Sequence, residues 1–163
     1  MEAQELLQQY ATGERDFCRV DLSRTELAGA ELIGIQLDWA ILNEANLHKA
    51  ILLEAHLSGT VMYKANLSEA ILTETDFYKA KLHQANLRKA ILYRAKLRRA
   101  NLRDADLREA VLVEADLTEA DLTGAQLEGA QFFKTKVPGG YIRHDDVALT
   151  PLLDSLDLGE TIG

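Results

Sequence analysis

Four histidines and one cysteine are the residues of this 163-residue chain best suited to bind a metal ion or to act as a nucleophile. No histidine has a second metal-binding residue at ligand spacing, and the four are His48, His56, His83 and His144. Cys18 has no histidine partner in the sequence, so we expect an incidental surface thiol. The glycines form no phosphate-binding loop. The sequence therefore predicts no catalytic residue, no metal site and no cofactor, and we expect that the protein is not an enzyme.

Basic residues are concentrated in one segment, where they could bind an anion. Residues 79–108 hold ten lysines and arginines but only two acidic residues, which gives this segment a net charge of +8. Since the whole chain carries a net charge of −8, the remainder carries −16. We call these ten residues the basic girdle: Lys79, Lys81, Arg88, Lys89, Arg94, Lys96, Arg98, Arg99, Arg103 and Arg108.

Two interpretations of the basic girdle are open. It is either an anion-binding or nucleic-acid-binding belt, or a solvated surface with ladders of opposite charge. The candidate anion-binding residues are Lys79, Arg88, Lys89, Arg94, Lys96, Arg98, Arg99 and Arg103. We favour the solvated surface, because the girdle would surround the molecule rather than line one groove and because few aromatic residues accompany it.

The composition limits the class of protein. Hydrophobic residues make up 47% of the chain, and there are two prolines and one cysteine. These values exclude a disordered tail, a collagen-like chain and a disulfide framework. No apolar run approaches the roughly 18 residues of a membrane span. The first residues lack the basic-then-apolar order of a secretory signal, so we expect a cytoplasmic protein without a membrane partner.

From residue 15 to residue 134 the chain repeats in units of five. A large apolar residue occupies the central position of each of the 24 units, and it is Leu in 20 of them. The exceptions are Phe17, Met62, Phe77 and Phe132. Two residues before the centre lies a small position, which is Ala in 18 units.

A period of five fits neither a helix nor a flat strand. On an α-helix, five residues advance by about 500°, so the central residues would be spread over every face. On a flat strand, an odd period sends successive central residues to opposite sides. They can all point inward only if the chain turns a corner in every unit. Apolar residues that recur in every fourth unit indicate four corners per coil, so the 24 units form about six coils. Six coils span roughly 29 Å at a strand spacing of about 4.8 Å.

This unit resembles that of the pentapeptide-repeat family, whose consensus is close to Ala-(Asp/Asn)-Leu-x-x. The resemblance covers about 120 of the 163 residues, and the segment from Tyr10 to Phe17 is similar to that of cyanobacterial members. It implies an all-β fold, a right-handed, four-sided β-helix solenoid, and the handedness comes from the resemblance alone. The chain departs from the consensus directly before the centre at Ile41, Ile51, Val61, Ile71, Ile91 and Val111.

The ends of a solenoid need caps, because they expose unpaired backbone groups. Residues 1–14 are predicted to form an N-terminal helical cap, which Gly13 ends. Its apolar residues, expected to cover the first coil near Phe17, are Ala3, Leu6, Leu7 and Tyr10.

Residues 15–134 are then the β-helix, and residues 135–163 are a C-terminal tail. The tail is predicted to begin with a turn at Pro138, Gly139 and Gly140, and a short helix could start at Thr150. It is too apolar to be a plain linker, so we expect it to dock on another surface.

One outer face is predicted to be apolar along its length. We call its residues the apolar stripe: Ile33, Ile51, Leu53, Ile71, Ile91, Tyr93, Val111, Val113 and Phe133. Three explanations are open: β-branched residues stack to favour the strand, the tail covers the stripe, or a partner binds it. We favour the third and treat the stripe as the candidate interface. Trp39 points outward at a corner, where it either contacts a partner or packs against the N-terminal cap.

These features predict a non-enzymatic scaffold that presents rigid outer ladders to a protein partner or to a second copy, as a homodimer. The alternative is a nucleic-acid-related regulator, through anion binding at the girdle or as a DNA mimic. The resemblance includes quinolone-resistance proteins, which are acidic dimeric rods that occupy DNA gyrase. The girdle would interrupt the negative surface that such mimicry needs, so we expect no nucleic-acid partner. We also expect no small-molecule substrate.

Overall fold

In 22 of the 24 five-residue units, the chain turns its corner through a hydrogen-bonded turn. The structure is a computed structural model, and it describes residues 1–141. Between Thr25 and Ala130, the N–H at the small position donates to the carbonyl of the preceding central residue at 2.9–3.3 Å. Two turn residues lie between them, and only the second has a positive φ. These are the properties of a type II turn.

The second turn residue adopts a left-handed backbone conformation in all 24 units, with φ between 51° and 72°. Only five of these residues are glycines. A left-handed residue that has a side chain costs roughly 1–2 kcal/mol. Stacking offsets this cost, because the same residue donates its N–H to the next coil, as Arg19 does to the Asp38 carbonyl at 2.9 Å.

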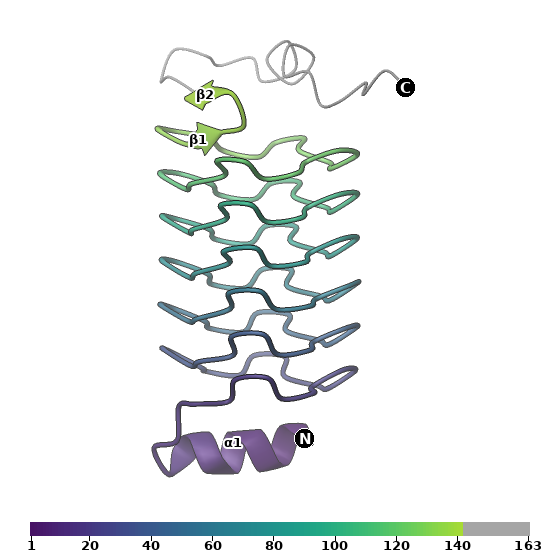
Figure 1. The fold of residues 1–163 in the computed structure, drawn as a ribbon, viewed down its shortest axis with the longest axis vertical. Coiled ribbons are helices and arrows are strands. Elements are labelled where there is room, and N and C mark those ends of the chain that lie inside the picture. The colour runs from purple at the N-terminus through teal and green to yellow at the C-terminus, as the bar shows by residue number, and fades with distance from the viewer. Residues whose placement is uncertain (142–163) are drawn as a thin grey trace.

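Successive coils are joined by parallel backbone pairing between equivalent residues, four units apart along the chain (Figure 1). The four resulting ladders define four faces. Face 1 starts at Asp16 and continues through Gln36 and each later coil to Lys136, and faces 2, 3 and 4 start at Asp21, Glu26 and Glu31. Each of the first 20 units forms three backbone hydrogen bonds to the next coil, with N···O distances of 2.7–3.2 Å. The result is a four-sided rod, and the six steps of face 1 span about 29 Å.

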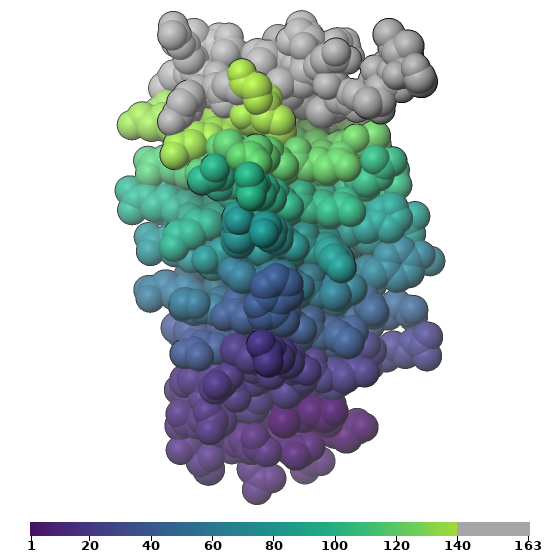
Figure 2. Space-filling model, viewed as in Figure 1, coloured from purple at the N-terminus to yellow at the C-terminus, as the bar shows by residue number. Residues whose placement is uncertain are grey.

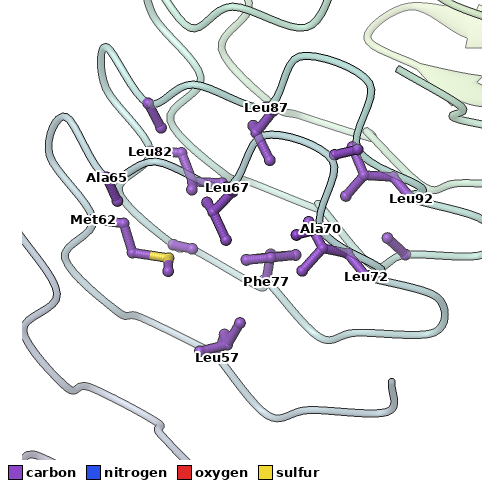
Figure 3. Packing of buried hydrophobic residues seen from close by; sticks show 14 of the residues in the cluster. Leu57, Met62, Ala65, Leu67, Ala70, Leu72, Phe77, Leu82, Leu87 and Leu92 are labelled. Atoms are coloured by element: carbon purple, nitrogen blue, oxygen red, sulfur yellow. The ribbon is translucent and has the colours of Figure 1, made fainter. Parts of the chain in front are cut away.

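The central residues fill the inside of the rod, as the five-residue period predicts. Those from Phe17 to Leu127 are all buried and belong to one apolar cluster. Figure 3 shows Leu67, Leu72 and Phe77 pointing from successive sides of one coil toward the same interior. Phe132, in the last coil, is only half-buried.

Helix α1, Ala3–Ala11, covers the N-terminal end of the rod (Figure 1). Leu6 is fully buried, and Ala3 and Tyr10 pack partly against the same cluster. The expectation for Leu7 is wrong, because this side chain is 38% exposed. Leu6 and Leu7 lie about 100° apart, at the two edges of the apolar side of the helix, with Ala3 and Tyr10 between them, so a helix that buries Leu6 turns Leu7 toward solvent.

The helix ends at Gly13, whose φ is 103°. Gly13 donates its N–H to the Tyr10 carbonyl at 3.0 Å, and Glu14 donates to the carbonyl five residues earlier at 3.1 Å, which is a Schellman motif. The same segment satisfies two edge carbonyls of the first coil. The N-terminal ammonium donates to the Asp21 carbonyl, and the Tyr10 hydroxyl donates to the Ile33 carbonyl, both at 2.9 Å.

The described chain ends in a hairpin of strands β1, Lys136–Val137, and β2, Gly140–Tyr141 (Figure 1). Pro138 and Gly139 form its turn, and Gly139 has a φ of 85°. Stacking continues past residue 134, because β1 extends the face 1 ladder and buries its valine.

The other expectations for the tail, a helix at Thr150 and docking on another surface, lie outside the described residues. Among residues 1–141, no helix is long and apolar enough to cross a membrane. Figure 2 shows the outward side chains as successive bands along the rod, and these bands carry the candidate sites.

Leu87→Ala tests the inward position of the central residues. We expect the free energy of unfolding to fall by about 3 kcal/mol, because Leu87 is fully buried and alanine leaves a cavity. Urea denaturation followed by circular dichroism measures this change. Lys81→Ala is the matched control: Lys81 is exposed, so we expect a change below about 0.5 kcal/mol. Equal losses in the two variants would contradict the assignment.

Gln84→Gly tests the left-handed turn. Gln84 has a φ of 57°, which glycine adopts without a steric cost. We expect a net gain in stability of about 0.5 kcal/mol, because the relief of strain exceeds the added entropy of the unfolded chain. Gln84→Val should lower the urea midpoint, because a β-branched residue fits this conformation poorly. A valine variant more stable than the glycine variant would refute this account.

Candidate interaction surfaces

The residue directly before each centre decides how the turn is capped. Ten units carry Asp or Asn there, and in all ten the Oδ1 accepts the N–H two residues ahead at 2.9–3.2 Å. That N–H belongs to the first turn residue and has no backbone partner in the stack, so the side chain completes the hydrogen bonding. The ten residues are Asp16, Asp21, Asn46, Asn66, Asp76, Asn86, Asn101, Asp106, Asp116 and Asp121.

Face 4 lacks these caps in four successive coils. The residues that take their place are Ile51, Ile71, Ile91 and Val111. An aliphatic side chain cannot accept a hydrogen bond. Nor does a side chain of the preceding coil reach the corresponding turn N–H groups, as Asn43 reaches that of Tyr63. They therefore have no acceptor among residues 1–141, and they belong to Leu53, Thr73, Tyr93 and Val113. Face 4 thus carries a row of free amide donors, about 4.8 Å apart, between two rows of side chains.

The structure places all nine residues of the apolar stripe on face 4. They form two ladders, one on each side of the buried central residues. Neighbours above and below leave most of them half-buried, and Ile33 and Ile91 are the most exposed, at 47% and 38%. Thr73 interrupts the second ladder.

Charged residues border the stripe on both sides. Lys89 and Glu109 form an ion pair at 3.6 Å along one border. Along the other border, the Arg94 guanidinium lies 3.7 Å from Glu74 and 2.7 Å from Glu114. An apolar centre within a polar rim is typical of protein–protein interfaces.

The arginines of the basic girdle are paired with acidic residues, mostly on the next coil. The pairs, at 2.5–3.3 Å, are Arg88–Glu109, Arg94–Glu114, Arg98–Glu119, Arg99–Glu119, Arg103–Asp121 and Arg108–Asp106. The girdle therefore consists largely of ladders of opposite charge. Exposed pairs of this kind contribute little to stability individually.

The girdle is also divided among all four faces. Face 1 carries Lys79, Lys96, Arg98 and Arg99, face 2 carries Lys81 and Arg103, face 3 carries Arg88, Lys89 and Arg108, and face 4 carries Arg94. A hollow of 380 Å³ on face 1 is lined by Tyr78, Lys96, Arg98, Arg99 and two carboxylates, Asp76 and Asp116. Because Glu119 binds both of these arginines, the hollow offers little uncompensated charge to an anion.

The arginines also set the ionisation of their partners. Hydrogen bonds from Arg99 and Arg98 lower the pKa of Glu119, and a hydrogen bond from Arg88 lowers the pKa of Glu109. A carboxyl group with a lowered pKa stays charged at neutral pH and is poorly suited to act as a general acid.

Within residues 1–141, no cluster of His, Cys, Asp or Glu side chains could hold a metal ion. The described histidines lie on three different faces: His48 on face 3, His56 on face 1 and His83 on face 2. Burial raises the pKa of the Cys18 thiol, which favours the unreactive protonated form. His144 lies outside the described residues.

The described residues also line two other hollows. One of 690 Å³ lies between the N-terminus and the first coil and is lined in part by Glu2, Asp21 and Arg24. Another, of 430 Å³, lies at the corner between faces 4 and 1, beside Glu54 and Arg94. Glu2, Asp21, Arg24, Glu54 and Arg94 are all exposed to solvent in these hollows.

The structure also places Trp39, for which the sequence left two options. Trp39 is the second turn residue of its unit on face 1, and its side chain is 58% exposed. The indole ring lies over Gly59, the equivalent residue of the next coil, so that a Cβ on Gly59 would collide with the ring. Trp39 therefore packs along the rod. A glycine at the equivalent position one coil after the tryptophan was the sequence signal for this contact.

Comparison with known proteins identifies the repeat. The model of the family described as pentapeptide repeats matches in eight copies, over residues 40–77, 72–104 and 100–136. No curated protein matches the chain.

Several solved structures are similar to this chain. A pentapeptide repeat protein from the cyanobacterium Cyanothece 51142 is 26% identical, with 83% of this chain and 99% of that chain covered and a TM-score of 0.39. HetL from Nostoc sp. strain PCC 7120, involved in heterocyst differentiation regulation, is 26% identical, with 88% and 100% covered and a TM-score of 0.27. QnrB1, a plasmid-mediated fluoroquinolone resistance protein, is 16% identical, with 76% and 73% covered and a TM-score of 0.43. Because these TM-scores lie below 0.5, the family assignment rests on the family model.

Glu119→Gln tests the ion-pair ladder through its pH dependence. The pKa of Glu119 is lowered in the folded protein from an ordinary value of 4.5. The stability that its charge contributes is therefore complete above the ordinary pKa, and it is lost as the pH falls through the lowered one. We expect the variant to have a lower urea midpoint than the wild type at neutral pH, and the difference to disappear in acid.

High salt should also reduce this difference at neutral pH, because the pair is exposed to solvent. A difference that is the same at neutral and acidic pH would mean that the amide disturbs packing rather than removing a charge.

Proposed function

Because this chain belongs to the pentapeptide-repeat family, we propose that it is a non-enzymatic interaction module, a rigid rod that binds another protein through face 4. The family fold is a right-handed β-helix. The observation that supports the proposal most directly is the replacement of the turn caps on face 4 by aliphatic side chains.

This replacement removes favourable contacts from the isolated rod. Each of the four missing caps forgoes a hydrogen bond of about 0.5–1.5 kcal/mol. The fold does not require the aliphatic residues, because Asp or Asn takes this position in ten other units. Removal of exposed apolar side chains from water by a partner lowers the free energy, and so favours association. A protein partner can cover these apolar side chains, and its carbonyl or carboxylate groups can accept hydrogen bonds from the free N–H groups.

Stacking of β-branched residues is a weaker explanation. It accounts for the ladder of Ile and Val before the centres, since such residues fit a pleated surface. It does not account for the second ladder, which includes Leu53, Tyr93 and Phe133. Both ladders are consistent with a binding surface that the stacked backbone holds rigid, so that little ordering entropy is lost on association.

The nucleic-acid alternative has less support. The girdle arginines are already paired with carboxylates, which compete with phosphate for them. A DNA mimic needs an unbroken negative surface, and the girdle interrupts it. The likeness to QnrB1 is too low to transfer gyrase binding to this chain.

Ile71→Asn combined with Ile91→Asn tests face 4 without disturbing the fold. Asn66 and Asn86 occupy the equivalent positions of face 3 and cap their turns, so the new residues should do the same. We expect an unchanged circular dichroism spectrum and cooperative unfolding. We also expect at least about tenfold weaker association, because the centre of the interface is lost. Co-purification from the native lysate and sedimentation equilibrium measure binding to a partner and to a second copy.

The matched control is His56→Asn with Lys96→Asn, which introduces the same residue at the same position of two coils on face 1. It should associate like the wild type. If the isoleucine variant keeps both the bound proteins and the mass of the wild type, face 4 is not the binding surface.

A further inference from the structure

A second apolar patch extends from the corner between faces 1 and 2 across face 2. We call Trp39, Ile41, Val61 and Tyr63 the Trp39 patch. Three of its members belong to the most exposed large apolar residues of the described chain, with Trp39 at 58%, Ile41 at 37% and Tyr63 at 36%. The two coils are in register here, because Ile41 pairs with Val61 and the Tyr63 N–H donates to the Asn43 Oδ1 at 3.0 Å.

Local structure holds the two aromatic rings of the patch in place. Trp39 has a φ of 62°, a strained conformation for an aromatic residue. In the other units this position holds glycine or a residue with a charged or amide side chain. Gly59 has no side chain where the indole lies, so the ring rests on the rod with part of its surface exposed. The Tyr63 ring stacks on His83 with centroids 5.7 Å apart and planes 18° apart.

Four exposed cations surround the patch, and none has an ion pair within the described part of the chain: Arg19, Lys64, Lys79 and Lys81. Arg19, Trp39, Gly59 and Lys79 are the second turn residues of four successive coils on face 1. Arg19 therefore lies one coil before Trp39, and Lys79 lies one coil beyond Gly59. Lys81 continues the face 2 ladder from Val61. The Lys64 ammonium lies 5.1 Å from the centre of the Tyr63 ring.

The acidic groups next to the patch are engaged by other partners. The Asp38 Oδ1 accepts the Ser58 N–H at 2.8 Å, and Glu44 pairs with Arg24 at 3.3 Å. Asp21, which precedes Ile41 in the face 2 ladder, accepts the N–H and the hydroxyl of Ser23. Glu44 is neutralised by Arg24, whereas Asp38 and Asp21 keep their charge, so the four cations still outnumber these two carboxylates and the rim is net positive, although the chain as a whole carries −8.

We infer that the Trp39 patch is a second docking site, for an acidic protein segment that carries an aromatic or aliphatic anchor. The exposed rings and aliphatic side chains form an apolar centre for the anchor, and the four cations complement carboxylates around it. A protein is favoured over single-stranded nucleic acid as the ligand. A site for single-stranded nucleic acid offers successive aromatic rings on which the bases stack, whereas here the aliphatic residues Ile41 and Val61 lie between the two rings. The site is separate from face 4 and does not depend on the function proposed for that face.

Selection from a library of random twelve-residue peptides displayed on phage tests this inference with the full-length protein. Binding peptides should be enriched in Asp or Glu together with an aromatic or aliphatic residue. Because Trp39 is the single tryptophan of the chain, its fluorescence reports directly on the site. Synthetic copies of the selected peptides should shift the Trp39 emission to the blue in a saturable manner, and high salt should weaken binding.

Three variants separate the site from general effects on the fold, with labelled peptide anisotropy as the readout. Trp39→Gly should fold at least as well as the wild type, because glycine suits the left-handed position, but it should bind at least about tenfold more weakly. Gly59→Lys should weaken binding similarly, because the new side chain displaces the ring while it adds a positive charge. Gly34→Lys is the control, since nothing lies within 4 Å of a Cβ there, and it should bind normally.

Several outcomes would overturn the inference. No enriched peptide, or peptides that bind Trp39→Gly as well as the wild type, would show that the patch is not a docking site. Stronger quenching of Trp39 by twelve-nucleotide oligothymidylate than by any selected peptide would assign the patch to nucleic acid. An emission shift that depends only on the concentration of the protein would assign it to a second copy of the chain.

Discussion

The hydrogen bond from each small-position residue back to the preceding central carbonyl is the interaction on which the rest of the structure depends. It closes the corner in 22 of the 24 units, which keeps Leu inside and brings equivalent residues of successive coils into register. It also leaves one N–H per unit without a backbone partner. The residue before the centre therefore shapes the surface: Asp or Asn completes the turn in ten units, Ile or Val exposes apolar surface in six, and the other eight units carry Glu, Gln, His or Lys there. In this protein a single position in five controls the character of each face.

The five-residue period and the recurrence of apolar residues in every fourth unit were sufficient to predict the four-sided coil with its buried central residues, because both follow from chain geometry. The handedness did not follow from the spacing and rests on the family. The ion pairs of the girdle were also accessible in principle, since Arg94 and Glu114 are separated by one full coil. The exposed position of Leu7 was missed because Leu6 and Leu7 lie at opposite edges of the apolar side of the helix, and the sequence does not show which edge packs against the rod.

The free amide donors of face 4 and the position of the Trp39 ring were harder to foresee. The row of donors becomes visible only when the partner of every turn N–H is known, as it is for the turns that Asn66 and Asn86 cap on face 3. The ring position depends on Gly59, a residue of the next coil whose only contribution is the absence of a side chain. In both cases the property belongs to a pair of coils rather than to one segment, so local propensity does not reveal it.

The two surfaces also differ in how they could recognise a partner. Face 4 offers a long row of apolar side chains and amide donors between borders of paired charge, so it is suited to an extended surface with acceptors. The Trp39 patch is confined to two coils and is bordered by cations without ion pairs in residues 1–141, so it is suited to a short acidic segment. A rigid rod keeps these surfaces at a fixed separation, and a protein that engages both would gain affinity from that fixed geometry.

The division of each coil into four units has a consequence for how such a surface can change. Duplication of one unit would preserve every turn and every buried Leu, but it would rotate all later residues by one face. Such an insertion after Glu74 would divide the apolar stripe between two sides of the rod while the interior remained intact. Duplication of four units would lengthen the stripe by one step without rotation. The length of an insertion, counted in whole units, therefore determines whether the rod gains a longer binding face or a different one.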